Sequence, residues 1–252
     1  MARTRVVSVI GYKNSGKTRV VESLVRELTG RGFSVGTVKH TADDVRLDTP
    51  GKDTWRHREA GSKATAIIHD RSAAVFYDRY LTVREAVERL GGLDIVVIEG
   101  LKTLEITPKI VVPRSASDME SLSDGLEVAI ARMPGVEIDG SGVPVIPIDG
   151  PGLLADVVEA RAFPLLPGLD CGGCGHGDCG GMARAILAGE ADAIGCVAMG
   201  SGFSLRVDGD EVALGPFVQT AFSNVVLGFV RSLKGVGGPS RVELSFEVAE
   251  DG

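Results

Sequence analysis

Short apolar runs alternate with segments of helical periodicity through the first two thirds of the chain. Residues 5–10 (RVVSVI) and 94–98 (DIVVI) are rich in β-branched side chains, which is typical of strands buried on both faces. Apolar residues recur at helical spacing over 17–29, and Gly30 ends this predicted helix. The same criteria predict a polar loop over 40–52, helices at 53–60, 81–90 and 153–162, and strands at 34–39, 64–68, 73–77, 110–112, 128–131 and 143–148. This alternation predicts an α/β fold with a mostly parallel sheet covered on both faces.

The pattern changes after residue 163. Two prolines and a glycine in 164–170 (PLLPGLD) predict a linker. Residues 203–214 alternate about an Asp-Gly pair and predict a hairpin, and 241–248 (RVELSFEV) predict a strand. One apolar stripe runs along a predicted helix at 216–233; we interpret it as core, with a partner helix or a membrane surface as alternatives. We therefore predict an α/β domain over 1–163, a linker over 164–170, a cysteine segment over 171–200 and a small α+β module over 201–252.

Composition narrows the class of protein. The chain has 252 residues, 44% of them hydrophobic, which is enough for one large core or for a medium core and a small one. Its net charge is −7, and no run of Lys and Arg is long enough to contact a nucleic-acid backbone along its length. Nucleic acid is therefore not an expected partner. We expect neither a signal peptide nor a membrane span, because the N-terminus lacks a cleavage site and no apolar run is long enough. A cytoplasmic protein is the resulting expectation.

Residues 11–18 (GYKNSGKT) match the phosphate-loop (P-loop) pattern G-x-x-x-x-G-K-[ST]. Glycines let the backbone turn its N–H groups toward phosphate oxygens, and the following helix N-terminus favours negative charge. Lys17 would reach the β- and γ-phosphates, and the Thr18 hydroxyl would ligate Mg²⁺. A chance match is the alternative, but the predicted strand before the loop and helix after it favour a true P-loop. We refer to residues 11–18 as the phosphate loop.

Acidic residues near predicted strand ends are candidates for holding the magnesium ion. Glu99 follows the strand at 94–98, where P-loop enzymes carry this carboxylate; the alternative is a solvent-facing residue at a strand end. Asp48 and Asp53 could face the same site, or could form turns and cap a helix. No N-K-x-D, H-R-D or D-F-G segment is present, so the residues alone do not identify the base. Since no arginine is identified as a finger in cis, any hydrolysis is expected to be slow.

Four cysteines follow the predicted linker with the spacing C-x2-C-x4-C-x16-C: Cys171, Cys174, Cys179 and Cys196. Three close thiolates can hold one face of a cubane and a distant fourth can complete it, while the surrounding glycines let the backbone approach the sulfurs. Zinc ribbons instead use two C-x2-C pairs, and a reducing cytosol disfavours disulfides. We predict a [4Fe–4S] cluster, with zinc, a disulfide or a redox dithiol as alternatives. A short helix is expected at 182–187, and His176 is interpreted as a solvated loop residue.

The first 163 residues resemble the molybdopterin-guanine dinucleotide biosynthesis protein B (MobB) family. The matching stretches are GYKNSGKT, VKHTADDVRLDTPGKDTWRHREAGS (38–62), VIEGLK (97–102) and KIVV (109–112). The resemblance implies a homodimeric P-loop protein that binds GTP and Mg²⁺, is at most a weak GTPase, and assists the molybdopterin guanylyltransferase. It implies catalytic roles for Lys17 and Glu99, Mg²⁺ ligation by Thr18 and Glu99, and nucleotide binding by Gly11, Lys13, Asn14, Ser15, Gly16, Lys17, Thr18, Lys39, His40, Asp48, Lys52, Asp53 and Gly100.

Residues 171–196 are similar instead to the four-cysteine iron–sulfur domain of electron-transfer subunits of anaerobic metabolism, including MARAILAGEA between the third and fourth cysteines. This resemblance implies a cluster with a redox role or an oxygen-sensitive one. The first interpretation is therefore a GTP-binding accessory protein for molybdenum or tungsten cofactor assembly. The second is an electron-transfer or redox-sensing protein switched by nucleotide. A small-molecule kinase is the third, and it lacks an identifiable substrate site.

Overall fold

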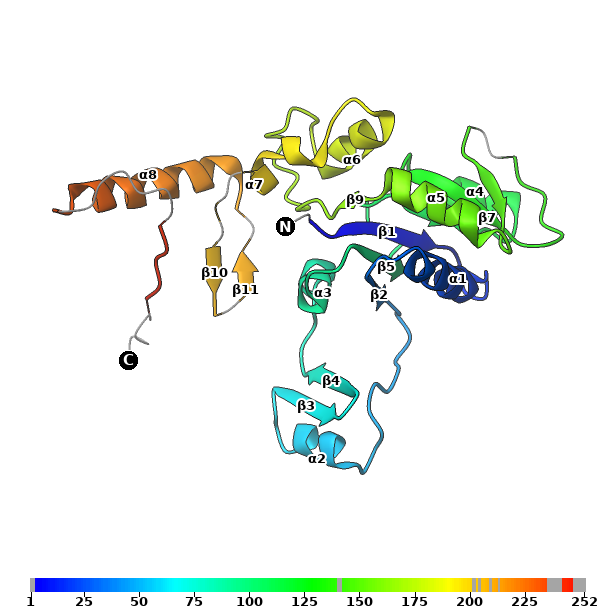
Figure 1. Ribbon diagram of the computed structural model, residues 1–252, viewed down its shortest axis with the longest axis horizontal. Coiled ribbons are helices and arrows are strands. Elements are labelled where there is room, and N and C mark those ends of the chain that lie inside the picture. Colours follow the sequence, from blue (N-terminus) through cyan, green and yellow to red (C-terminus); the bar gives the residue numbers. More distant parts are fainter. Residues whose placement is uncertain are drawn as a thin grey trace.

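A mostly parallel sheet organises the first part of the chain in this computed structural model, which describes residues 3–139, 142–200, 203, 205–208, 210–212, 214–234 and 242–246 (Figure 1). Within these residues seven strands form one sheet, and six of them run parallel. The parallel strands lie in the order β2 (Val35–Lys39), β5 (Ile95–Glu99), β1 (Arg5–Ile10), β6 (Lys109–Val111), β7 (Glu127–Arg132) and β8 (Val145–Pro147). The predicted α/β fold with a mostly parallel sheet is confirmed.

Helices cover both faces of this sheet, which explains why its strands are apolar at successive positions. On one face, α1 (Lys17–Gly30) and α5 (Pro151–Arg161) pack against strand residues that include Val7, Val97 and Ile110. On the other face, α3 (Val83–Leu90) packs near Val6 and Val96, and α4 (Ala116–Leu122) packs near Ile10 and Val111. The pattern did not predict α4, because only Asp118 and Leu122 of this helix are buried and it carries no apolar stripe.

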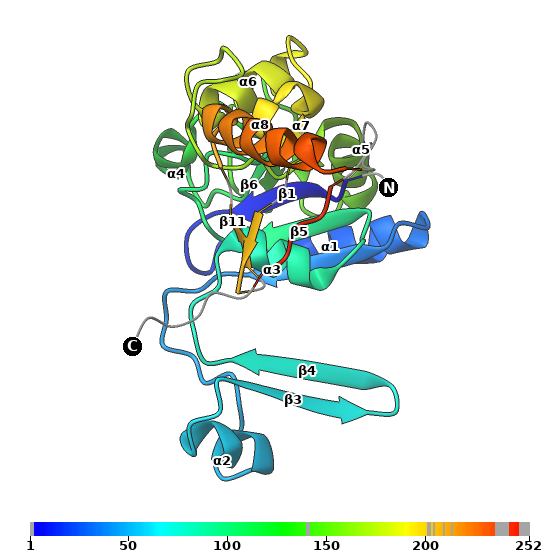
Figure 2. The same ribbon diagram turned by 90° about the vertical axis from the view of Figure 1, so that its left-hand side faces the viewer.

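An arm made of α2 (Asp53–Glu59), β3 (Ala64–His69) and β4 (Ser72–Tyr77) stands apart from the sheet in both views (Figures 1 and 2). Strands β3 and β4 pair antiparallel over six residue pairs and form a two-stranded sheet of their own. The predicted strands at 64–68 and 73–77 are therefore confirmed. Their apolar side chains Ile67, Ile68 and Val75 are exposed, so this hairpin does not contribute to the main core.

The segment predicted as a linker, 164–170, begins with residues that are paired and buried rather than exposed. Strand β9 (Phe163–Pro164) pairs antiparallel with the first two residues of β1, and Leu165 and Leu166 are buried. Leu166 packs with Met182 of α6 (Cys179–Ala188), a helix longer than the predicted 182–187. The chain continues through a 3-10 turn at Ala193–Gly195 and α7 (Val197–Gly200). Residues 163–166, where the linker was predicted to begin, are thus joined to the sheet by strand pairing and to α6 by apolar contact.

The C-terminal part only partly follows its pattern. The predicted hairpin is present as β10 (Leu205–Val207) and β11 (Asp210–Val212), with residues 204, 209 and 213 outside the described set. Helix α8 (Pro216–Ser232) forms, but its apolar stripe is exposed at Val218, Val225 and Phe229, so the core interpretation is wrong for this structure. Residues 242–246 have no strand partner among the described residues, which differs from the strand predicted at 241–248.

No helix among the described residues combines the length and the apolar character needed to cross a bilayer.

Candidate functional site

Parallel strand ends gather the predicted phosphate site at one edge of the sheet. The register aligns Val9 of β1 with Glu99 of β5, and Lys39 of β2 with the same Glu99. On the other side of β1, Ile10 aligns with Val111 of β6. Since the phosphate loop directly follows β1, these registers bring Lys39, Glu99 and the loop to the same edge.

The phosphate loop has a backbone shape that its glycines and Asn14 permit. Asn14 has φ of 62° and Gly16 has φ of 94°, both in the left-handed region. A Cβ atom at position 11 would lie 2.5 Å from Ser15 Oγ and 2.5 Å from the Val112 carbonyl oxygen, so only glycine fits there. The Ser15 hydroxyl is buried and has no hydrogen-bond partner among the described residues. A curled backbone with an unsatisfied polar group is the arrangement that an anion would complete.

Lys17 begins α1 and lies inside this loop. Its Nζ donates a hydrogen bond of 2.6 Å to the Tyr12 carbonyl oxygen. Burial lowers the pKa of Lys17, the negative charge of Glu99 opposes that shift, and the positive charges of Lys39 and Arg114 add to it. A bound phosphate would favour the charged lysine and so offset the cost of its burial.

Glu99 is the acidic centre of the site. The Thr18 hydroxyl donates to Glu99 Oε1 at 2.8 Å, and Lys39 Nζ lies 3.0 Å from the same oxygen. The Glu99 side chain is only 10% exposed, whereas the Lys39 side chain is 61% exposed. A hydroxyl and a carboxylate are oxygen ligands of the kind that Mg²⁺ prefers. Thr18 and Glu99 therefore fit a magnesium ion beside the phosphate loop.

The structure divides the other predicted nucleotide residues between two places. Lys13 is exposed and pairs with exposed Asp43 at 3.1 Å. The His40 backbone N–H donates to the Glu99 carbonyl oxygen at 3.0 Å. A Cβ atom at Gly100 would lie 2.9 Å from the His40 carbonyl oxygen, so this strand end also requires glycine. Lys13, His40 and Gly100 are thus at the phosphate edge.

Asp48 and Lys52 lie instead in the loop that leads into the arm, and Asp53 is the first residue of the arm itself. Asp48 accepts hydrogen bonds from the Thr49 backbone and the Thr54 hydroxyl at 2.8 and 3.0 Å, which is the turn-forming role left open by the sequence. Lys52 is the N-cap residue of α2, and Asp53 is its first residue. The loop at 40–52 leads away from the sheet, so these three residues do not join the phosphate loop of their own chain (Figure 1).

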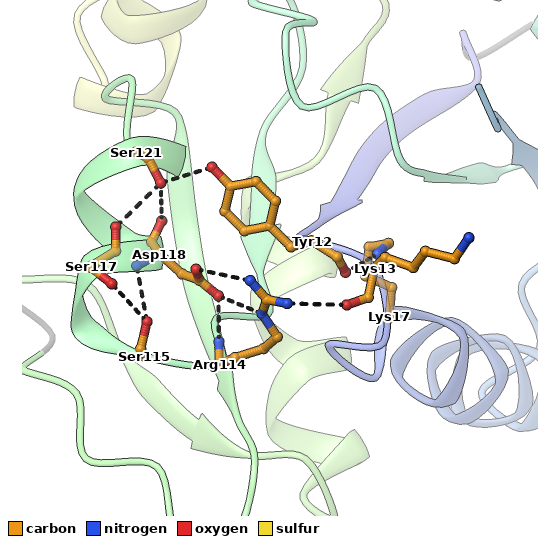
Figure 3. A network of polar contacts seen from close by, with 8 residues as sticks. All are labelled: Tyr12, Lys13, Lys17, Arg114, Ser115, Ser117, Asp118 and Ser121. Carbon is orange, nitrogen blue, oxygen red and sulfur yellow. Dashed lines mark hydrogen bonds and ion pairs between the residues drawn. The ribbon is translucent and has the colours of Figure 1, made fainter. Parts of the chain in front are cut away.

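Three residues at the phosphate edge were not predicted as site residues: Tyr12, Lys102 and Arg114. The Tyr12 carbonyl accepts from Lys17, and the Tyr12 ring lies beside the Arg114 guanidinium (Figure 3). Lys102 and Arg114 follow β5 and β6 by three residues each. Their positions just beyond strand ends were a usable signal, but it required knowing that β5 and β6 both flank β1.

The four cysteines gather around a second site. Cys171, Cys174, Cys179 and Cys196 all line one hollow, whose other walls include Leu166, Leu169 and Met182. No disulfide joins them. Among the described residues, no three His, Cys, Asp or Glu side chains converge closely enough to hold a single metal ion. Four thiols that line one hollow are ligands of the kind that iron–sulfur clusters use.

Local backbone features support this cysteine site. A Cβ atom at Gly181 would lie 2.2 Å from the His176 carbonyl oxygen, so the glycine loop can fold only without side chains there. Burial raises the pKa of the Cys179 thiol, and the backbone groups of residues 168–170 act in the opposite direction. The Cys179 backbone N–H donates to Asp170 at 3.0 Å. These contacts fix the third cysteine at the start of α6.

Comparisons with known proteins match both sites to families. The model of "Molybdopterin guanine dinucleotide synthesis protein B" matches residues 6–132, and that of "Putative Fe-S cluster" matches residues 166–198. A Methanocaldococcus jannaschii protein named "Putative molybdopterin-guanine dinucleotide biosynthesis adapter protein" is 31% identical over 252 residues, covering 98% of this chain and 99% of that protein. The Haemophilus influenzae "Molybdopterin-guanine dinucleotide biosynthesis adapter protein" is 32% identical over 124 residues, covering 43% of this chain and 63% of that protein.

A solved structure agrees with these matches. The crystal structure of Bacillus subtilis MobB superposes with a TM-score of 0.55 at 26% identity, covering 63% of this chain and 98% of that chain. The chain therefore belongs to the MobB family, and it carries in addition a segment of the "Putative Fe-S cluster" family.

Proposed function

We propose that this protein is a GTP-binding adapter in molybdopterin guanine dinucleotide biosynthesis, where it assists the guanylyltransferase. The observation that carries the proposal is the hydrogen bond between Thr18 and Glu99 beside the phosphate loop, within the residues that match the MobB model. The full-length match to a protein named as an adapter of this pathway supports the same function. Binding of nucleotide, with hydrolysis weak at most, is the proposed activity.

Each residue of the phosphate edge has a proposed role. Backbone N–H groups of residues 13–18 would surround the phosphates, with Gly11, Asn14 and Gly16 permitting the curl. Lys17 would neutralise phosphate charge, and Thr18 with Glu99 would hold Mg²⁺. The Lys39 ammonium, 3.0 Å from Glu99, would then be free to approach a phosphate oxygen. Asp48, Lys52 and Asp53 would act only if a second chain brings them to this edge.

We further propose that the four cysteines hold a [4Fe–4S] cluster. Their common hollow, the absence of a disulfide among them and the match of residues 166–198 support a cluster. When bound, such a cluster supplies one-electron redox chemistry. The chain would contribute four thiolates, an apolar wall at Leu166 and Met182, and backbone groups near Cys179.

The first experiment is calorimetric titration of anaerobically purified protein with GTP and with ATP. We expect GTP to bind more tightly, and Lys17→Ala to abolish binding of either nucleotide. Lys63→Ala is the control, because Lys63 is exposed between α2 and β3. A wild-type protein that prefers ATP would contradict the base assignment, and binding by Lys17→Ala would contradict the site.

We propose a homodimer that forms through the arm, because the β3–β4 hairpin leaves apolar side chains exposed in the single chain. A two-stranded sheet is marginally stable in water, and β3–β4 exposes Ile68 at 82% of its surface. A second copy of the arm would cover these apolar side chains. Light scattering after size exclusion should give twice the chain mass, and Ile68→Lys should give one chain mass. A monomeric wild-type protein would contradict this interface.

A nucleotide-switched redox protein is the second candidate function. One observation favours it: Ile106, seven residues after Glu99, packs in the same apolar cluster as Cys174 and Cys196. The segment after the magnesium carboxylate therefore contacts the cysteine site. Redox titration with and without GTP tests this function. A change in midpoint potential on GTP binding would favour the redox function, and an unchanged potential would contradict it.

A further inference from the structure

Two cations lie beside the ring of Tyr12, the second residue of the phosphate loop. Lys102 Nζ lies 4.4 Å from the ring centroid, and Arg114 Cζ lies 5.2 Å from it. The Tyr12 hydroxyl donates to Ser121 Oγ of α4 at 3.0 Å, so the ring is tied to that helix (Figure 3). Neither cation belongs to the phosphate-loop pattern, and they come from two different strand ends.

The position of Lys17 shows which end of the loop these cations occupy. A P-loop lysine reaches the β- and γ-phosphates, and Lys17 Nζ lies 2.6 Å from the Tyr12 carbonyl oxygen. Arg114 Nη1 lies 3.5 Å from the carbonyl oxygen of the next residue, Lys13. Arg114 therefore stands at the end of the loop where the terminal phosphate of a nucleotide would lie.

Asp118 holds Arg114 in this orientation. Arg114 Nε and Nη2 lie 2.9 and 3.4 Å from the two Asp118 carboxylate oxygens, and the Arg114 backbone N–H donates to the same carboxylate at 3.0 Å. These contacts use Nε and Nη2 but leave Nη1 directed at the loop (Figure 3). Because the Arg114 side chain is 51% exposed, a ligand can still reach the guanidinium.

We propose that Arg114, supported by Lys102, binds the terminal phosphate and makes the site selective for a nucleoside triphosphate over a diphosphate. This inference rests on the proposed nucleotide binding at the phosphate loop. A guanidinium suits a phosphate because it offers several N–H donors in one plane. A diphosphate lacks the group that would reach Arg114, so it gains nothing from this contact. Asp118 and Ser121 act as positioning residues through Arg114 and Tyr12.

The test compares GTP and GDP affinities by calorimetry on the full-length protein with Mg²⁺. Loss of one hydrogen bond to a charged group at this half-exposed position corresponds to a loss of affinity of about tenfold. Arg114→Gln should therefore weaken GTP binding about tenfold and change GDP binding less than about twofold. Arg114→Lys should recover part of the loss, because the positive charge remains. Arg26→Gln is the control, since Arg26 is exposed on α1.

A second variant separates contact from positioning. Asp118→Asn keeps Arg114 but weakens its orientation, so we expect a smaller loss of the GTP-to-GDP ratio than in Arg114→Gln. The proposal would be overturned if Arg114→Gln weakened GTP binding and GDP binding equally. It would also be overturned if both affinities stayed at their wild-type values. If the wild-type protein prefers ATP, the base assignment fails while the ATP-to-ADP ratio tests Arg114 in the same way. A wild-type protein that binds no nucleoside triphosphate overturns both proposals.

Discussion

The hydroxyl oxygen of Thr18 lies 2.8 Å from Glu99 Oε1, although 81 positions separate the two residues in the chain. This distance follows from the sheet, because Thr18 is in the first turn of the helix after β1 and Glu99 ends the neighbouring β5. The same carboxylate oxygen also lies 3.0 Å from Lys39 Nζ. One carboxylate oxygen therefore contacts both the hydroxyl at the end of the phosphate loop and the ammonium group of a neighbouring strand.

Glu99→Gln is expected to uncouple nucleotide binding from magnesium. In the wild-type protein Mg²⁺ should strengthen GTP binding by about tenfold or more, equivalent to about 1.4 kcal/mol. The amide introduced by this substitution is a poorer Mg²⁺ ligand than a carboxylate, so the ratio of affinities with and without Mg²⁺ should approach one. Calorimetry in Mg²⁺ and in EDTA measures this ratio. Glu22→Gln, at an exposed position on α1, should retain the wild-type ratio.

GTP binding is expected to take up a proton at alkaline pH. Burial lowers the pKa of Lys17 below its usual 10.5, so the free site loses this proton at a lower pH than the unfolded chain does. Within that window the unfolded chain binds more protons, and the stability contribution of Lys17 rises with pH. Phosphate favours the charged lysine, so affinity should fall as pH rises through the lowered pKa. Titrations at alkaline pH in buffers of different ionisation enthalpy measure the uptake, and its absence would contradict the prediction.

Leu166→Ala is expected to destabilise the chain by about 2–5 kcal/mol. Leu166 is fully buried and packs with Phe163, Met182 and Cys196 where the sheet meets the cysteine segment. Leu153→Ala is the matched control, because Leu153 is 57% exposed on α5 and should change stability by less than about 0.5 kcal/mol. Urea unfolding of the full chain without cluster measures both changes. Equal effects of the two variants would show that the 163–166 segment does not pack as described.

Cys174→Ala is expected to remove iron without unfolding the nucleotide site. Cys174 lines the hollow shared by the four cysteines, whereas the phosphate edge is formed by β1, β2, β5 and β6. Iron and sulfide analysis after anaerobic purification should show loss of the cluster, with GTP affinity within about twofold of wild type. His176→Ala should keep its iron. Zinc without iron in the wild-type protein would rule out the cluster.

The main sheet was predictable because its strands are buried on both faces. The pattern over 5–10 coincides with β1, and the helix predicted at 17–29 differs from α1 by one residue. Thr18 and Glu99 could both be predicted as magnesium ligands, because Thr18 ends the phosphate loop and Glu99 directly follows the strand at 94–98. Helix α4 escaped detection because it has almost no apolar face, although its Ser115 cap is a helix-start signal.

The hydrophobic pattern could not predict which residues from distant segments lie together, because the tertiary arrangement determines this. The strand order brings Tyr12, Lys102 and Arg114 together, because β5 and β6 both flank β1. The hydrophobic periodicity of single segments does not determine that order. Asp48 is nine positions from Lys39, yet the loop carries it toward the arm. Periodicity identified the apolar stripe of α8 correctly but could not tell whether anything covers it.

Strand β9 pairs with β1, although it follows β1 by more than 150 residues in the chain. The edge of β1 facing β6 is paired at Ser8–Ile10 by β6 and at Arg5 and Val6 by β9, which begins at residue 163. A nascent chain emerges with β1 first, so this edge stays half unpaired until residues 163 and 164 have been synthesised. Two separately expressed fragments divided before Phe163 should accordingly reassociate by strand addition. Residues that directly precede the segment matching the "Putative Fe-S cluster" model thus complete one edge of the first strand in the sheet that carries the phosphate loop.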